Sequence, residues 1–218
     1  MRLTYFGHSC FLLQASDDTR VILDPYLSGS FDGAIKYEPV NETADVVIAS
    51  HLHDDHGATD TIPGNPRVLT HPVSETAGAV KITGVDVAHD EAGGEKRGKN
   101  TIVVLDDGDL RLAHLGDLGH TLDADVLKVI GPVDVALVPV GGFFTIDHDE
   151  AAQVVESLGP KIVIPMHYKT DKVDFPIATV DPFLATQKVV EHRDDSVLEV
   201  TKATLPVERV TIVLKNAR

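Results

Sequence analysis

The 218-residue chain predicts an α/β layered fold in which β-sheets are buried between helices. Short apolar, β-branched runs bounded by turn residues recur along the sequence and are typical of strands. Acidic turns separate some of these runs and indicate antiparallel hairpins, whereas helical periodicity follows others. This mixture of hairpins and strand–helix units argues against a TIM barrel or a Rossmann fold.

Nine apolar runs are expected to form strands: residues 2–6, 10–14, 20–23, 46–49, 67–69, 101–105, 110–114, 135–138 and 161–164. Asp17-Asp18 lies between the second and third runs, and residues 106–109 (Asp-Asp-Gly-Asp) lie between the sixth and seventh. Both segments have the composition of hairpin turns, so much of the sheet should be antiparallel.

Helical periodicity is clearest in three segments: residues 74–80, 124–130 and 149–158. Gly159-Pro160 ends the last of them, and His148 is expected at its start. Residues 90–99 are rich in glycine and charge and predict an exposed loop. No Gly/Ser/Pro-rich linker or short repeat divides the sequence, so one domain is expected to span residues 1–218.

Composition restricts the class of protein. Lys and Arg number 19 against 34 Asp and Glu, which gives a net charge of −15 that repels nucleic-acid phosphates and anionic membranes. We therefore expect a small-molecule substrate, with no nucleic acid and no membrane as partner. Cys10 is the single cysteine, expected as a small buried hydrophobe, and no signal peptide is evident, which favours a cytoplasmic location.

The segment Ser-His-Leu-His-Asp-Asp-His-Gly at residues 50–57 follows the buried-looking run 46–49. On an extended backbone, His51 and His53 can direct their imidazoles the same way, while Asp55 and His56 on the following turn can face a second ion. The alternative is a polar, solvated strand end. A chance match of this pattern is on the order of a few in a thousand, which favours a metal site.

This HxHxDH string resembles the signature of the metallo-β-lactamase superfamily. The resemblance implies an αββα sandwich with mostly antiparallel mixed sheets, and a dinuclear site with seven ligands. The string supplies four ligands, and a lone histidine, a bridging aspartate and a final histidine should follow at strand ends. Residues 7–13 (Gly-His-Ser-Cys-Phe-Leu-Leu) and 23–26 (Leu-Asp-Pro-Tyr) resemble the opening of the subgroup that contains ascorbate-6-phosphate lactonase, N-acyl-phosphatidylethanolamine phospholipase D and small uncharacterised Zn-dependent hydrolases.

Each later ligand has a candidate. His89 ends an apolar alternation, whereas its competitor His71 is followed by proline and reads as the end of a structural strand. Gly116-Asp117 follows a strand, and its carboxylate can share two oxygens between two ions. His167 ends the run that begins at residue 162. The resemblance then assigns His51, His53 and His89 to one ion, Asp55, His56 and His167 to the other, and Asp117 to both.

The expected cofactors are two divalent metal ions, with Zn²⁺ first and Mn²⁺ or Fe as alternatives. The paired ions would lower the pKa of a shared water, and the resulting hydroxide would attack a carbonyl carbon or a phosphorus. Asp55 and Asp117 are therefore also the candidate catalytic residues. Four further residues are candidates for substrate contact or for support of the ligands: His8, Asp24, His120 and Tyr168.

For His8 a direct role and a supporting role both stay open, and Asp24 is expected to orient metal-binding histidines. His120 could contact a leaving group or lie at the surface. Tyr168 and Lys169 could reach a substrate oxyanion or lie at the surface. His114 is expected in the core.

The function expected is hydrolysis of a small ester, lactone or phosphodiester. A non-catalytic or binding protein that retains the metal site is the alternative from another class. An RNase Z-like nuclease is disfavoured, because the charge is acidic and no basic cluster lies between the ligands. Residues 171–218 look extended, unlike the helical region of a glyoxalase II type thiolesterase. Relatives of this kind are often oligomers, so a homo-oligomer is compatible with the resemblance.

Overall fold

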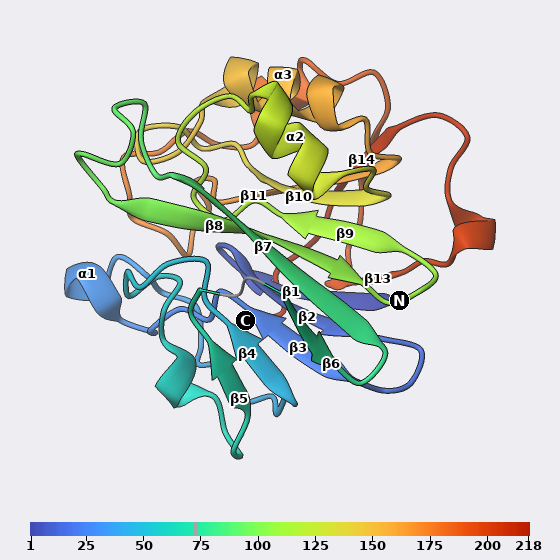
Figure 1. Cartoon of the computed structure of the whole chain (residues 1–218). Coiled ribbons are helices and arrows are strands. Elements are labelled where there is room, and N and C mark those ends of the chain that lie inside the picture. The colour runs from blue at the N-terminus through green and yellow to red at the C-terminus, as the bar shows by residue number, and fades with distance from the viewer. Residues whose placement is uncertain (72–73) are drawn as a thin grey trace.

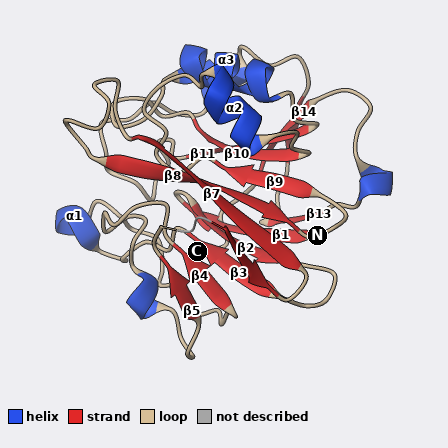
Figure 2. Ribbon diagram, in the orientation of Figure 1, coloured by secondary structure: helices blue, strands red, loops and turns tan. Residues whose placement is uncertain are grey.

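The computed structural model describes residues 1–71 and 74–218, and it contains two mixed β-sheets packed face to face (Figure 1). Side chains from both sheets fill the space between them, including Leu3 and Phe11 from one sheet and Leu112 and Ile164 from the other. Helices α2 (Ala124–Ile130) and α3 (His148–Leu158) cover the outer face of the second sheet (Figure 2). The α/β layered fold predicted from the sequence is confirmed.

The first sheet contains β1 (Arg2–Gly7), β2 (Cys10–Gln14), β3 (Arg20–Leu23), β4 (Val46–Ile48), β5 (Arg67–Leu69) and β13 (Val197–Glu199). Their order is β13-β1-β2-β3-β4-β5. β1, β2 and β3 are antiparallel neighbours, and the predicted Asp17-Asp18 turn joins β2 to β3. β3, β4 and β5 run parallel.

The second sheet contains β6 (Ser74–Ala77), β7 (Val80–Ala88), β8 (Lys99–Asp106), β9 (Arg111–His114), β10 (Val135–Pro139), β11 (Ile162–Met166), β12 (Val190–His192) and β14 (Val210–Val213). Their order is β12-β14-β11-β10-β9-β8-β7-β6. The hairpin predicted at residues 106–109 joins the antiparallel β8 and β9, while β9, β10, β11 and β14 are parallel. Both sheets therefore combine predicted hairpins with parallel pairs.

The helix expected at residues 74–80 is wrong, because this segment forms β6, a turn and the start of β7. Ala77 pairs with Val80, and Gly78 in the turn has φ +52°. A Cβ on Gly78 would lie 1.9 Å from the Thr19 hydroxyl oxygen, so the turn packs directly on the β2–β3 hairpin. The alanines favour a helix locally, but the glycine turn and the pairing with β7 override that preference.

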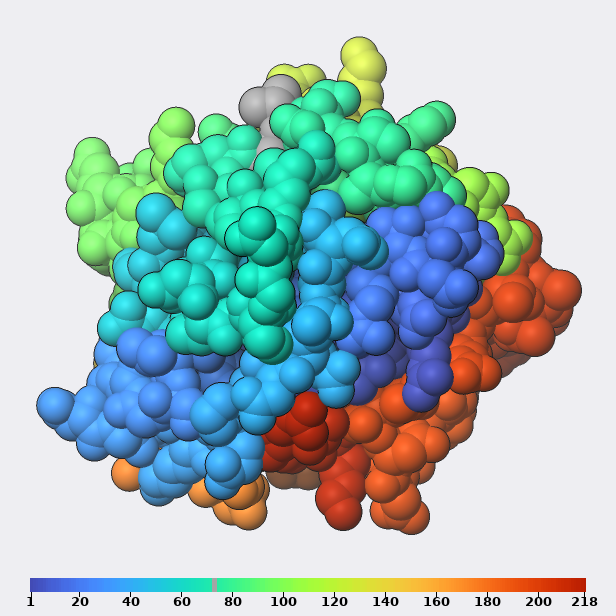
Figure 3. Space-filling view, turned by 90° about the horizontal axis from the view of Figure 1, so that it is seen from below, coloured from blue at the N-terminus to red at the C-terminus, as the bar shows by residue number. Residues whose placement is uncertain are grey.

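The outer face of the first sheet carries few helical residues. Helix α1 (Ser30–Gly33) and a 3₁₀ turn (Thr59–Thr61) lie in its connections, and loop side chains such as Tyr37 and Phe175 pack against the sheet. From below, the surface over this sheet is formed mainly by the first third of the chain, with the C-terminal segment beside it (Figure 3). Ala217 donates its backbone N–H to the Tyr5 carbonyl, which fixes that segment.

After β11 the chain is largely extended, as expected, with only α4 (Asp181–Leu184) and a second 3₁₀ turn (Lys202–Thr204) as helical segments among the described residues. Strand β13 extends the first sheet, whereas β12 and β14 extend the second. The last part of the chain thus ties the two layers together. Among the described residues, every helix is too short or too polar to cross a bilayer.

The direction of the strands brings their carboxyl ends to a common edge in each sheet. In the first sheet β1, β3 and β4 share a direction, because β2 is antiparallel to both β1 and β3. In the second sheet β7, β9 and β11 share a direction for the same reason. Residues that directly follow these six strands can therefore meet at one end of the sandwich.

Asp147 caps helix α3, and its carboxylate accepts the backbone N–H groups of Asp149 and Glu150, each at 3.0 Å. We expect Asp147→Ala to lower the free energy of unfolding by about 1 kcal/mol, the usual effect of losing an N-cap. Asp149→Ala, which removes a carboxylate of the same turn without removing the cap, is the control. Urea denaturation of both variants measures the difference, and equal stabilities would contradict this role for the cap.

Candidate metal centre

The metal ligands predicted from the sequence follow the carboxyl ends of the co-directional strands. Residues 51–56 follow β4, while His89 and His167 come directly after β7 and β11, and Asp117 lies three residues after β9. His8 and Asp24 follow β1 and β3 in the same way. The topology thus gathers side chains from distant parts of the sequence at one end of the two sheets.

One group of ligand atoms comes from His51, His53 and His89, which approach one another within 4.8 Å. The ring centroids of His51 and His89 are 4.8 Å apart, and those of His53 and His89 are 5.2 Å apart. His51 and His89 are buried, whereas His53 is exposed. Solvent can therefore reach this group of histidines at His53, whereas His51 and His89 are shielded from it.

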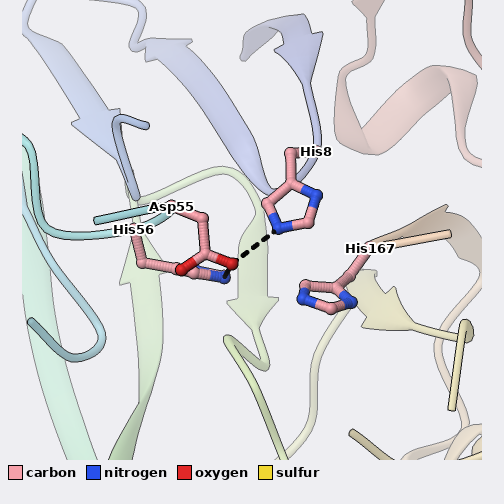
Figure 4. Close-up of side chains that lie close together, drawn as sticks. All are labelled: His8, Asp55, His56 and His167. Atoms are coloured by element: carbon pink, nitrogen blue, oxygen red, sulfur yellow. Dashed lines mark hydrogen bonds and ion pairs between the residues drawn. The ribbon is translucent and has the colours of Figure 1, made fainter. Parts of the chain in front are cut away.

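A second group comes from Asp55, His56 and His167, with His8 as a further member, again within 4.8 Å (Figure 4). All four side chains are buried. The Nε2 atom of His8 lies 3.1 Å from the Asp55 carboxylate, and its ring centroid lies 4.2 Å from that of His167. His8 is thus in direct contact with the predicted ligands.

Asp117 lies between the two groups and directs one carboxylate oxygen to each. Its Oδ2 atom is 3.2 Å from Nε2 of His89 and 3.8 Å from Nε2 of His51. Its Oδ1 atom is 3.1 Å from Nε2 of His56 and 3.5 Å from Nε2 of His167. This is the arrangement that a carboxylate bridging two cations requires.

Buried polar atoms in this cluster lack hydrogen-bond partners among the described residues. They include Nε2 of His51, Nε2 of His56, both ring nitrogens of His167 and Oδ1 of Asp117. Unpaired buried groups of this kind are rare in folded proteins because each costs desolvation free energy. Imidazole nitrogens and carboxylate oxygens that face one another are suited to hold a divalent cation, so the residues present fit a metal centre.

Asp24 fixes the orientation of the histidines. Its carboxylate accepts the backbone N–H of Ser50 at 2.6 Å, the Ser50 hydroxyl at 2.7 Å and Nδ1 of His56 at 2.8 Å. Since the Ser50 hydroxyl donates to Asp24, its oxygen can accept Nδ1–H of His51, 3.1 Å away. Protons on both Nδ1 atoms leave both Nε2 atoms for a metal.

The electrostatic environment keeps most of the predicted ligands in the protonation states that suit metal binding. Burial lowers the pKa of His51 to about 3 and the pKa of His167 to about 4, so both rings are neutral at neutral pH. Burial works to raise the pKa of Asp117, but His167 and His56 hold it well below its usual value. Asp117 therefore stays ionised.

His56 differs from His51 and His167, because three carboxylates surround it and favour its protonated form. Burial acts to lower the pKa of His56, but Asp117, Asp55 and Asp24 together raise it well above its usual value. These carboxylates therefore favour a positive charge at Nε2 of His56. A bound cation satisfies the same requirement as a proton.

Asn100 and Gly116 hold the turn that carries Asp117. Asn100 accepts the backbone N–H of Asp117 at 3.0 Å and donates to the Leu115 carbonyl at 2.8 Å. Gly116 has φ +54°, and a Cβ there would lie 2.2 Å from Oδ1 of Asn100 and 2.7 Å from the Ser50 side chain. The glycine thus permits close packing against residues that support the ligands.

The other sequence candidates lie outside the cluster. Both ring nitrogens of His120 bond to backbone groups, at the Ala88 N–H and the Thr121 carbonyl. Tyr168 is buried in the hydrophobic cluster beneath α3, and Lys169 binds the Asp174 carboxylate and the Phe175 carbonyl. Among the described residues, the contacts of these side chains are therefore local hydrogen bonds and packing contacts.

Three residues were expected to have structural rather than metal-binding positions: His114, Cys10 and His71. His114 is buried, donates Nε2–H to the Ser9 carbonyl and accepts the Gly116 N–H, so it is a hydrogen-bonded core histidine. Cys10 is buried, and burial raises the pKa of its thiol well above the usual value. His71 is exposed and belongs to no candidate metal group among residues 1–71 and 74–218.

A pocket of about 200 Å³ opens onto the cluster. His53, Asp55, His89 and Asp117 line it together with Phe31, Arg97, Phe144 and Phe175. Phe144 belongs to the loop after β10, Phe31 to the short helix α1 and Phe175 to the loop between β11 and α4, and no motif would have identified the last two. Arg97 lies in the segment 90–99 that was expected only as an exposed loop, and nothing in its sequence indicated a pocket residue.

Backbone strain is concentrated at this end of the molecule. His8, Asp24 and His167 are non-glycine residues with φ of +53°, +46° and +50°. Such conformations cost roughly 1–3 kcal/mol each and persist where the surrounding structure imposes them. They let a strand stop and direct its next side chain into the cluster.

Known proteins resemble this chain along most of its length. Residues 2–167 match the family model described as "Beta-lactamase superfamily domain". A UPF0173 metal-dependent hydrolase of Korarchaeum cryptofilum is 34% identical over 211 residues, covering 88% of this chain and 90% of the relative. One of Carboxydothermus hydrogenoformans is 32% identical over 196 residues, covering 78% and 85%.

Solved structures agree with the sequence comparison. A Thermotoga maritima protein, described as a candidate Zn-dependent hydrolase of the metallo-beta-lactamase superfamily, is 36% identical to this chain. Its TM-score is 0.81, and the match covers 98% of this chain and 97% of that one.

Asp24 should act on metal affinity through the orientation of His56 and His51. We expect Asp24→Asn to weaken Zn²⁺ binding by about 10- to 100-fold, the usual effect of removing such a support. Competition with a chromophoric chelator measures the affinity. The control is Asp194→Asn, which changes an exposed carboxylate. Equal affinities in the two variants would exclude this role of Asp24.

Gly116→Ala should combine a strained φ with a steric clash. We expect a loss of about 2–4 kcal/mol in the free energy of unfolding of the metal-free protein. Gly93 has φ +72°, and a Cβ there would meet no atom within 4 Å, so Gly93→Ala isolates the strain and should cost only about 1 kcal/mol. Denaturant titration of both variants would refute the clash if the two losses were equal.

Proposed function

The chain belongs to the beta-lactamase superfamily and to its UPF0173 metal-dependent hydrolases, and from this premise we propose that it hydrolyses a small ester, lactone or phosphodiester at a site for two divalent ions. The observation that carries the proposal is the position of Asp117. Each of its carboxylate oxygens faces a different histidine pair, at distances of 3.1 to 3.8 Å. A site for a single ion would not need the two oxygens of one carboxylate to face separate pairs of histidines.

In the proposed site, His51, His53 and His89 hold one ion, Asp55, His56 and His167 hold the other, and Asp117 holds both. Imidazole nitrogens combined with carboxylate oxygens suit Zn²⁺, which we take as the metal, and Mn²⁺ or Fe would also fit. Two such ions supply Lewis acidity and lower the pKa of a bound water.

The side chains themselves have distinct roles in this proposal. Asp55 and Asp117 keep their carboxylates ionised, since neighbouring histidines hold the pKa of each below its usual value against the effect of burial. His8 donates its Nε2–H to the Asp55 carboxylate and so fixes the plane of that carboxylate. Asp24 orients His56 and His51, and the exposed side of His53 leaves an approach for substrate.

The pocket supports a compact substrate. Its volume of about 200 Å³ lies below the roughly 300–1,000 Å³ of sites for drug-sized ligands. The net charge of −15 also disfavours RNA, which argues against an RNase Z-like nuclease.

Metal content and turnover test the proposal together. Purified protein incubated with Zn²⁺ should retain two ions per chain, and ions at about 100 times their Kd should stabilise the folded state by about 2.7 kcal/mol per site. The loaded protein should hydrolyse at least one member of a panel of aryl esters, lactones and bis-p-nitrophenyl phosphate.

His53→Ala should lower both metal content and turnover, because it removes a ligand on the open side of the site. His192→Ala, which changes an exposed histidine of β12, is the matched control and should alter neither. Elemental analysis gives the stoichiometry, and initial rates give the turnover. One ion per chain, or no hydrolysis across the panel by fully loaded protein, would contradict the proposal.

A further inference from the structure

The pocket beside the proposed metal centre is lined by a positively charged side chain that has no role in the proposed reaction. Arg97 lines it together with His53 and Asp117. Its Nη2 atom donates to the Phe143 carbonyl at 3.0 Å, and its guanidinium carbon lies 5.5 Å from the centre of the Phe144 ring. One N–H of the five is thus engaged by this bond, and the residue as a whole is half-buried.

Arg97 differs from the other arginines of the chain. Each of the seven other arginines has a carboxylate oxygen within 4.0 Å of its guanidinium. Arg97 has none among the described residues, although the chain carries 34 acidic side chains. An unpaired guanidinium at a pocket wall is a ready partner for an anionic group of a ligand, because its planar fork matches a carboxylate or a phosphate.

The loop that carries Arg97 is fixed relative to the metal centre. Asp90, which directly follows the ligand His89, is buried and accepts four backbone N–H groups of this loop. They belong to Ala92, Gly94, Lys96 and Arg97, at 2.8 to 2.9 Å. The position of Arg97 is therefore built into the same segment that supplies a ligand.

Aromatic rings form the rest of the pocket wall. The Phe175 ring lies 5.3 Å from Phe31 and 5.6 Å from Phe144, centre to centre. Phe31, which lines the pocket, has a φ of +52°, a costly conformation for a bulky residue. The Phe31 side chain is exposed, so its own burial does not explain this conformation. A role in contacting a ligand would.

We propose that this pocket selects small esters or lactones that carry an oxyanion, a carboxylate or a phosphate, on a compact apolar group. The guanidinium of Arg97 pairs with the oxyanion, and Phe31, Phe144 and Phe175 cover the apolar part. The inference rests on the proposed function for the position of the scissile bond. Hydrolysis adds water across the acyl C–O bond, which yields a carboxylic acid and an alcohol from an ester or a single hydroxy acid from a lactone.

A purely structural role for Arg97 makes a different prediction. As a latch, Arg97 would join its loop to Phe143 and steady Phe144, and its loss would affect charged and neutral ligands alike. As a selector, it would affect only ligands that carry the oxyanion. The ratio of the two responses therefore separates these roles.

The first arm of the test compares two isosteric esters, 4-acetoxybenzoate and 4-acetoxybenzamide, on Zn²⁺-loaded protein. We expect the unmodified protein to prefer the anionic ester in kcat/KM, and Arg97→Gln to reduce the ratio by about 10-fold, the effect of a half-buried charge-assisted hydrogen bond. Arg97→Lys should retain part of the preference. Arg193→Gln, which changes an ion-paired arginine after β12, should leave the ratio unchanged.

The second arm measures binding without turnover. Calorimetric titration of the loaded protein with benzoate, phenylphosphonate and benzamide should show that Arg97→Gln weakens at least one of the two oxyanions by about 10-fold relative to benzamide. Whichever oxyanion depends more on Arg97 identifies the preferred group. Thermal unfolding and metal content of each variant confirm that fold and loading are intact.

The two arms separate failure of this inference from failure of the proposed function. Arg97-dependent oxyanion binding with no hydrolysis of any substrate would support the pocket and reject the hydrolytic proposal. Hydrolysis with an anionic-to-neutral ratio that Arg97→Gln leaves unchanged, together with binding that does not depend on Arg97, would overturn the inference and leave the proposed function standing.

Discussion

The position of the Asp117 carboxylate between two groups of imidazoles is the constraint on which the rest of the site depends. Each oxygen faces a different histidine pair, so Asp117 must lie between residues that follow β4 and β7 on one side and residues that follow β4 and β11 on the other. This requires a tight turn after β9, which Gly116 permits and Asn100 holds. It also requires that strands of both sheets end at the same edge.

Concentrating this many polar groups in the interior is unfavourable without a compensating cation. Nitrogens and oxygens that lack partners among the described residues would each cost free energy of burial, and the backbone at His8, Asp24 and His167 adds strain. The surrounding core offsets that cost. Rigid sheets on both sides and the hydrogen bonds to Asp24 keep the predicted ligands in place.

The sequence predicted those parts of the molecule that are encoded locally. Residues 51–56 form a compact string, and His89 and His167 each end an apolar run, so their placement at strand ends could be read directly. The nine predicted strands overlap observed strands for the same reason. The segment at residues 74–80 failed because pairing with β7, a tertiary contact, decided its structure.

Other parts depend on contacts that no local pattern contains. Asp24 meets Ser50 across 26 residues of sequence, and Asn100 meets Asp117 across 17. Arg97, Phe31 and Phe175 share a pocket only because three segments far apart in the sequence converge, and a charged, glycine-rich loop gives no indication of such a role. The orientation of the histidine rings and the strained backbone at His8, Asp24 and His167 likewise cannot be predicted without the three-dimensional structure.

A crystal structure of the zinc-loaded protein, with anomalous data collected at the zinc absorption edge, tests the central claim most directly. We predict two anomalous peaks on opposite sides of the Asp117 carboxylate, with one oxygen of Asp117 bound to each ion. A single peak, or an Asp117 side chain that turns away from the histidines in the loaded protein, would contradict this claim.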